Sequence, residues 1–546
     1  PALCAALMRP GHLHNPIVEG ILKVIDLSRT LYSIVIAKII RVSLVFVLLI
    51  ALFGFGTAKL FEKTPKTFLA SEDQSFFMME VQLPDGSSAN RTVEVAEEVR
   101  NIVKTIPGIS NIMIITGFSM MNQGSAANSA FFAVTLLPIE ERKDPSLRVD
   151  SIVRQVYMRT FLFQKANVYA FNVPPIMGLG SIGGLEYQLE AVGGGSPFEM
   201  AEVMRTLTAE ANRDPRLSNV YSTFTTNSPQ LFLDVDRDLA ISLGVNLSEL
   251  FNTLQIMFSG YYVNDFNEFG RTWKVNIQAE AEFRNSEADI LNMYVRSAAG
   301  DMIPLSSLVK ISSIAAPPSI PRFNNIRSLR INGDAALSVS TGDAIAAMEE
   351  VSERVLPQGY TYEWTGTTQQ EKESSGVMLI IFALSFVFVY LFLVALYESW
   401  IIPLPVIVSV TVALFGGMLF IFLRDKFIDL YVQIGLVVLI AIACKNAILM
   451  VEFCKDARSA GAGIYEAAVS GAKTRFRAVV MTSLAFVGGV FPMFIASNVG
   501  ANAQQSIGTV VIGGMLFSTS IGILFIPSLY AVFEFIRSLP DRLSKK

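Results

Sequence analysis

Six long apolar runs, five of them after residue 375, constrain this chain more than any other feature of its sequence. About twenty apolar residues are enough for a helix to cross the hydrocarbon core of a bilayer, and a helix satisfies its own backbone hydrogen bonds there. The sequence therefore predicts an α-helical membrane bundle. We expect spans at residues 40–60, 376–396, 401–423, 430–453, 479–496 and 507–535.

Three clusters of Lys and Arg set the orientation of the predicted spans. They lie at residues 23–41, 455–477 and 537–546. The positive-inside rule places all three in the cytoplasm, so the even number of spans places the polar segment after the first span, residues 61–374, outside it. Residues 424–429 fall on the outer side although Arg424 and Lys426 lie there, which departs from the rule.

Composition excludes several kinds of site. Apolar residues make up 52% of the chain and charged residues 16%, as in a membrane protein. None of the three cysteines lies in residues 61–374, so disulfides cannot hold that segment. The net charge is −4 and no zinc-type or P-loop spacing occurs. We therefore expect no nucleic-acid partner, no metal site and no cofactor.

The polar segment alternates β-rich runs with helical patterns in the order β-α-β-β-α-β, which is typical of a ferredoxin-like split βαβ unit. The expected strands are residues 76–83, 109–116, 130–137 and 167–173, and the expected helices are 91–106 and 146–163. A second unit begins at 186–192 and continues through a helix opened by a capping box of Ser196 and Glu199. Its pattern stops after residue 225 and resumes near residue 328, so a separate module interrupts it.

These patterns divide the chain into segments with distinct roles. We expect the end of a previous span and a cytoplasmic amphipathic segment in residues 1–39, the first span in 40–60, one α+β subdomain in 61–181, a second in 182–225 and 319–366, the inserted module in 226–318, five spans in 376–535 and a cytoplasmic tail in 536–546.

Several motifs resemble the resistance-nodulation-division (RND) efflux pumps, in their hydrophobe/amphiphile branch. The membrane motifs are YESWIIP at 397–403, ACKNAILMVEF at 443–453 and MTSLAF at 481–486. The motifs of the polar segment are EDQ at 72–74, VQLP at 81–84 and YVNDF at 262–266. The resemblance covers essentially the whole chain.

The resemblance implies a particular place in a larger assembly. The chain would be the C-terminal half of a twelve-helix fold, and residues 1–8 do resemble the end of an earlier apolar helix rather than a signal peptide. It implies a homotrimer in the bacterial inner membrane that exports amphiphilic, drug-like small molecules in exchange for protons. A periplasmic adaptor, an outer-membrane channel and membrane lipids are its implied partners. The two α+β subdomains would be porter subdomains, and the inserted module would dock to the channel.

Lys445 lies well inside an apolar run, where a charge costs a few kcal/mol and usually pairs with an acid facing the bundle interior. Glu452 and Glu534 are the acids within the predicted spans, and both lie near an end. We therefore expect the counter-ion of Lys445 to come from outside this chain. The plainer alternative is that Lys445 snorkels about 12 Å to the cytoplasmic surface.

By the same resemblance, Lys445, Asn446, Arg475 and Thr482 belong to a proton relay completed by two aspartates of the other half. Protonation of a paired carboxylate would free Lys445 to find another partner. The plainer alternative makes Arg475 a positive-inside anchor and Thr482 a back-bonded polar residue. Ala478 stands where similar pumps usually carry Pro, which puts the bend of that helix in doubt.

Residues 117–128 form a segment that is apolar at its start and rich in Gly, Ser and Asn at its end, so we expect a mobile loop. In similar exporters this loop is a switch between two substrate pockets, with Phe118 at the first aromatic position and Met120 replacing a second. We expect the deep pocket to be lined by Met113, Ile115 and Phe131 or Phe132. Ordinary core packing is the alternative for these strand residues.

Three rival interpretations remain open. The pairs Met78–Met79 and Met120–Met121 suggest export of a soft metal ion, but neighbours in a strand face opposite sides. A protein-translocation or sterol-receptor protein with the same membrane fold would lack the inserted module. Lipid-like cargo, or a chain without function, is the third. No enzyme is expected, since His12 and His14 are the two histidines and both lie on the cytoplasmic side.

Overall fold

The computed structural model describes residues 16–122, 124–176, 178–180, 183–336 and 339–543. Cys4, His12 and His14 lie outside the described residues. The chain forms two compact units. One consists of Pro84–Ser88 and Phe224–Ile320, and the other contains the rest of the chain.

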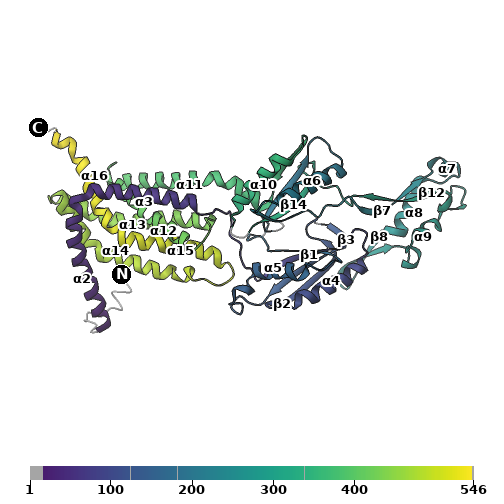
Figure 1. The fold of residues 1–546 in the computed structure, drawn as a ribbon, viewed down its shortest axis with the longest axis horizontal. Helices are drawn as coiled ribbons and strands as arrows, with labels where there is room; N and C mark the ends of the chain where they lie inside the picture. Colours follow the sequence, from purple (N-terminus) through teal and green to yellow (C-terminus); the bar gives the residue numbers. More distant parts are fainter. Residues whose placement is uncertain (1–15, 123, 177, 181–182, 337–338, 544–546) are drawn as a thin grey trace. The chain divides into compact units, whose positions relative to one another are not determined.

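Within the described residues, six helical segments of the larger unit are long and apolar enough to span a membrane, the number expected from the sequence. Their helices are α3 (Ser43–Lys63), α11 (Gly366–Tyr397), α12 (Leu404–Leu423), α13 (Leu430–Ser459), α14 (Ile464–Phe494) and α15 (Ala501–Phe517) followed by α16 (Ile523–Leu543). A further helix, α2 (Pro16–Ile39), precedes α3. Helices α12, α13, α14 and α15 lie side by side (Figure 1).

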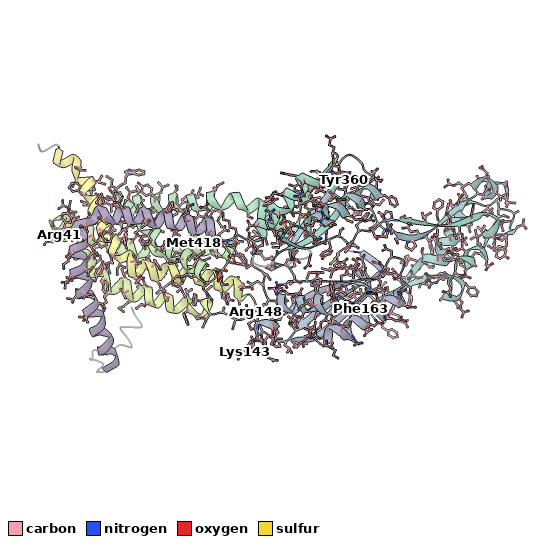
Figure 2. The ribbon with its side chains drawn as sticks, viewed as in Figure 1. Arg41, Lys143, Arg148, Phe163, Tyr360 and Met418 are labelled. Carbon is pink, nitrogen blue, oxygen red and sulfur yellow. The ribbon has the colours of Figure 1, made fainter. Side chains whose placement is uncertain are left out.

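Small residues allow a close contact between α12 and α15. The sequence GGMLF occurs at residues 416–420 of α12 and again at 513–517 of α15. A Cβ on Gly416 would lie 2.7 Å from the carbonyl oxygen of Gly513, and a Cβ on Gly513 would lie 2.7 Å from that of Gly416. The two backbones therefore approach as small residues allow in membrane helices. Met418, labelled in Figure 2, is fully buried in the same bundle.

The helices extend beyond the apolar runs at the end where the basic cluster 455–477 lies. Helix α13 continues to Ser459 and α14 begins at Ile464, so most of this cluster is helical. Arg458 forms an ion pair of 3.7 Å with Glu534 of α16. Helicity extends past the apolar run because Lys, Arg and Ala are good helix formers in water.

The first sheet has the strand order β2-β3-β1-β4. Its elements are β1 (Phe76–Gln82), α4 (Ala89–Lys104), β2 (Ile109–Ser119), β3 (Gly124–Leu136), α5 (Val149–Thr160) and β4 (Asn167–Phe171). All its strand pairs are antiparallel. Phe77, Met79 and Phe132 point into the core formed with α4 and α5.

The second sheet is completed only after the chain has returned from the smaller unit. It contains β5 (Leu185–Ala191), β6 (Leu217–Tyr221), β13 (Arg322–Phe323), β14 (Ile326–Ala335) and β15 (Tyr360–Trp364), with α6 (Pro197–Ala211) and α10 (Thr341–Val355). The capping box expected at Ser196 and Glu199 is present at the start of α6. Strand β5 therefore pairs with strands that follow it by more than 130 residues in the chain.

The smaller unit has its own hydrophobic core, which includes Ala240, Leu250 and Leu305. It contains β7 (Ser228–Val235), α7 (Arg237–Ser242), α8 (Leu247–Leu254), β8 (Tyr261–Glu268), β9 (Arg271–Ile277), α9 (Glu287–Leu291), β10 (Tyr294–Arg296), β11 (Met302–Pro304) and β12 (Val309–Ala316). Strands β8 and β9 form a hairpin whose residues are all exposed.

Candidate functional site

The predicted membrane site lies where α13 meets α14. Asn446 is buried on α13, and its Nδ2 donates a hydrogen bond of 2.9 Å to Oγ of Ser483 on α14, which is also buried. Lys445 and Thr482 each precede one partner of this bond in the sequence, and both side chains are exposed. Among the residues that the structure describes, no acid forms an ion pair with Lys445.

Arg475 and Thr482 make contacts within the described part of the chain. The guanidinium of Arg475 stacks on the ring of Phe453 at 3.8 Å, but its buried Nε has no acceptor among the described residues. The hydroxyl of Thr482 donates to the carbonyls of Ala478 and Val479, both at 3.0 Å. Arg475 lies seven residues before Thr482, about 10 Å along the helix. Its place in a relay with Lys445 stays a prediction.

An apolar face accompanies these polar groups. Exposed apolar side chains on α13 and α14 include those of Ile434, Val438, Met481, Leu484 and Phe491. Exposed apolar residues within a membrane helix contact lipid or other helices. A lysine in such surroundings usually pairs with an anionic group.

The end of the bundle away from the basic cluster 455–477 contains two buried acids that are not among the predicted site residues. Asp429 caps α13 by accepting the backbone N–H of Val432 at 2.7 Å, and it also accepts the hydroxyl of Ser506. Glu72 accepts the N–H groups of Asn502 and Ala503 at the start of α15. An Asp just before an apolar run is a common helix-start signal, so Asp429 could have been found from the sequence.

Arg424, the cation that departs from the positive-inside rule, is satisfied by the chain itself. Its Nη1 donates to Oγ1 of Thr509 at 2.7 Å and to the carbonyl of Phe494. Its guanidinium also lies 4.2 Å from the centre of the Phe494 ring. These contacts give Arg424 a structural role.

The predicted pocket residues divide between the two faces of the first sheet. Ile115 pairs with Phe131 across β2 and β3, and both lie on the face opposite the helices, as does Met113. The rings of Phe118 and Phe131 meet edge to face, with centroids 6.5 Å apart. Phe132 is a wrong assignment, because it points to the other face and is fully buried in the core. Strand alternation separates these two neighbours.

The expected loop at residues 117–128 is mostly strand. Strand β2 continues to Ser119 and β3 begins at Gly124, so the turn contains only residues 120–123, of which Gln123 lies outside the described residues. The pairing shifts between Thr116 and Phe118, where Gly117 has a φ of +80°. A bulge with a glycine of positive φ lets a polar sequence continue a hairpin. The prediction of a twelve-residue loop was therefore wrong.

One methionine from each pair enters a small cluster beneath the hairpin. Met121 and Phe171 are its buried members, and Met78, Tyr169 and Tyr221 pack against them. Met79 points instead into the core of the first sheet, as strand alternation requires. The remaining members are aromatic, so the cluster has the composition of a packing contact.

A cavity of about 590 Å³ is lined by residues of both sheets. Its lining includes Tyr157, Phe171, Asp334 and Glu371. Burial raises the pKa of Asp334 to about 6, against a hydrogen bond to Asn219 that lowers it. Phe118, Met113 and Ile115 are not among the described residues that line this cavity. Its residues come from segments far apart in the chain, so no local sequence pattern predicts this cavity.

Comparison with known proteins places these features in a family. The family model described as AcrB/AcrD/AcrF matches residues 1–534. The toluene efflux pump membrane transporter TtgB of Pseudomonas putida is 36% identical over 536 residues, which are 96% of this chain and 51% of that protein. The multidrug export protein AcrF of Escherichia coli is 35% identical over 541 residues, 97% of this chain and 52% of AcrF. The chain spans about half the length of the curated relatives it matches.

Proposed function

This chain belongs to the AcrB/AcrD/AcrF family, and we propose that it is part of a proton-driven transporter that exports amphiphilic compounds from the periplasm or the inner membrane. Its relatives are named as toluene, multidrug and solvent efflux pumps. Six apolar helices and a large sheet-rich segment fit such a transporter. The chain would supply one half of a twelve-helix bundle, and the relay would use charges from both halves.

The main support for this proposal is Lys445, which has no acidic ion-pair partner among the described residues. Lys445 lies beside the buried Asn446–Ser483 bond, on a face where apolar side chains are exposed. A carboxylate from helices outside this chain would pair with it and remain ionised. When that carboxylate takes up a proton, the attraction to Lys445 is lost and a second helix packing becomes favoured. Arg475 and Thr482 would be further members of this relay.

The same proposal assigns roles to the soluble parts. The two sheets would be ferredoxin-like porter subdomains in the periplasm, and Phe118, Met120, Met113, Ile115 and Phe131 would contact cargo. The smaller unit would dock to a periplasmic adaptor or an outer-membrane channel in a homotrimer. The exposed β8–β9 hairpin, with Phe266, Phe269 and Trp273, suits such a contact because exposed aromatic residues mark protein interfaces.

Substitution of Lys445 by Met tests the proposal. In a full-length pump, Lys445→Met keeps an unbranched side chain but removes the charge, so we expect drug export to be lost while the amount of protein in the membrane stays the same. Lys455→Met is the matched control, since Lys455 lies on the same helix but contacts the ring of Tyr397 near the cytoplasmic end. Normal export by Lys445→Met at equal expression would contradict the proposal.

A further inference from the structure

Glu80 is a carboxylate in an unusual place, the middle of the central strand of the first sheet. In β1 it lies between Phe131 of β3 and Tyr169 of β4, on the face without helices. It is nevertheless fully buried. A buried carboxylate is costly unless hydrogen bonds replace its water, so its partners define its role.

Those partners come from the tip of the β2–β3 hairpin, residues 119–122. The hydroxyl of Ser119 donates to Oε1 of Glu80 at 2.6 Å, and the N–H of Met121 donates to Oε2 at 3.0 Å. The N–H of Met120 is a further donor. Ser119 in turn accepts the N–H of Asn122 at 3.1 Å. One carboxylate therefore holds every residue of the tip, directly or through Ser119.

The tip also reaches the second sheet. The guanidinium of Arg330 on β14 donates to the carbonyl of Met121 at 3.4 Å. The hydroxyl of Thr223, just after β6, donates to Oδ1 of Asn122 at 2.8 Å. The hairpin that carries Phe118 is thus held by Glu80 on one side and by the second sheet on the other.

The groups around Glu80 determine how readily its carboxylate takes up a proton. The titratable and charged groups that face it are Tyr169 of β4, Tyr221 of β6 and, through the tip, Arg330 of β14. No ion pair to Glu80 occurs among the residues that the structure places. Burial raises the pKa of Glu80, although the donors of the tip lower it. Proton uptake removes the charge that strengthens the hydrogen bonds from Ser119, Met120 and Met121, and it turns one acceptor position of the carboxylate into a donor.

We propose that Glu80 is a positioning residue for cargo passage. Its ionised carboxylate fixes the hairpin tip and, with the tip, the ring of Phe118. When the carboxylate takes up a proton, the tip is released. The role in passage rests on the export function proposed above. The hold of the Glu80 carboxylate on the hairpin tip, which we call the latch, rests only on the contacts of Glu80. Proton uptake at Glu80 would loosen the tip on the first sheet while Thr223 and Arg330 still hold it on the second.

A spin label on the hairpin tests the latch without transport. Ser125 is exposed and pairs with Phe118 across the hairpin, so a nitroxide on Ser125→Cys, in a full-length pump without its native cysteines, reports the motion of the hairpin. We expect the mobile fraction to rise several-fold as pH falls through the raised pKa of Glu80. Glu80→Gln imitates the protonated carboxyl, because it is uncharged and has one acceptor oxygen, so its hairpin should be mobile at every pH. Glu80→Leu should be mobile at every pH.

The control is Glu94→Gln, which alters an exposed acid on α4 of the same subdomain and should titrate like the unmodified protein. A pH response that survives in Glu80→Gln, or an immobile hairpin in Glu80→Gln or Glu80→Leu, would overturn the latch. Either result would leave the Lys445 test of export untouched. Conversely, loss of the response in Glu80→Gln supports the latch even if Lys445→Met still exports.

Discussion

Charged groups are satisfied differently in the first sheet and in the membrane helices. Arg142, beside the first sheet, has a fully buried side chain that donates to both carboxylate oxygens of Asp73, to the hydroxyl of Ser75 and to the carbonyls of Leu137 and Leu147. In the membrane helices, neither Lys445 nor Nε of Arg475 finds an acceptor within the described residues. Arg142 thus finds its partners within its own subdomain, whereas, among the residues that the structure describes, these two groups of the membrane helices do not.

This difference predicts which charged residues stabilise the fold and which act in proton coupling. A charge whose partners are all in its own subdomain holds the fold, and its loss should unfold that subdomain. A charge whose partners lie elsewhere adds little to the fold of this chain, and its loss should affect coupling instead. Substitutions of the two kinds should therefore have opposite effects on stability and on export.

The largest stability effect is expected for Arg142→Leu. It removes the cation that pairs with Asp73 and the donor to two partly buried carbonyls, which costs about 3–5 kcal/mol for a broken buried pair. Hydrogen exchange of peptides from β1 and β3 would measure the loss. Arg100→Leu is the matched control, since Arg100 pairs with Glu97 at the surface and such pairs contribute about 0–1 kcal/mol. Equal exchange in the two variants would contradict the comparison.

The pH dependence of the Arg142–Asp73 pair has a defined sign. Burial opposes ionisation of Asp73, but the hydrogen bonds from Arg142 and from two backbone N–H groups hold its pKa below the usual range. An acid with a lowered pKa stabilises the fold above its unfolded pKa, and that stability is lost as the pH falls through the folded pKa. The pair is therefore fully effective at neutral pH.

The sequence predicted the elements better than their contacts. Apolar runs of about twenty residues and the β-α-β-β-α-β order follow from local periodicity, and the structure contains six apolar helices and the strand order β2-β3-β1-β4. The hairpin at residues 117–128 was mistaken for a loop because its Gly, Ser and Asn residues disfavour strands locally. Pairing with β2 and the bonds to Glu80 overcome that preference.

A candidate site residue could be predicted where its side chain differs in polarity from the residues around it in the sequence. Lys445 stands out because it interrupts an apolar run. Glu80 does not, since an acid in an alternating strand usually faces water, and its burial depends on a hairpin some forty residues later. Phe131 and Phe132 could be assigned to faces only once the register with Met79 and Glu80 was known.

A smaller effect is expected for Asp334→Asn, which tests whether every buried charge of the soluble region stabilises it. Burial raises the pKa of Asp334 to about 6, so the folded state binds its proton more tightly than the unfolded state. The contribution of Asp334 to the free energy of unfolding is therefore fully present below its unfolded pKa of about 4. This contribution is lost as the pH rises to the folded pKa of about 6. At neutral pH the Asn variant should be more stable by about 2–3 kcal/mol.

Hydrogen exchange of β14 peptides between acidic and neutral pH would measure this difference. The Asn amide oxygen can keep the bond to Asn219, so the variant isolates the charge. Glu94→Gln, at an exposed position, should show no such difference. An Asn variant that is less stable at neutral pH would mean that Asp334 has an ionic partner and resembles Asp73.

The smallest stability effect is expected for Thr482→Val, which sharpens the comparison within one membrane helix. Thr482 and Thr474 both lie on α14, and both are exposed and donate their hydroxyl to a carbonyl of the preceding turn. Valine keeps the shape of threonine, so each substitution should change the unfolding free energy by no more than about 0.5 kcal/mol.

Thr482, however, precedes Ser483 at the bond to Asn446, and Thr474 does not. If a relay passes this point, Thr482→Val should lower proton-coupled export and Thr474→Val should not, at matched expression. Equal export by the two variants would mean that Thr482 is a back-bonded residue without a role in coupling, and the proton that reaches the partner of Lys445 would then need another route.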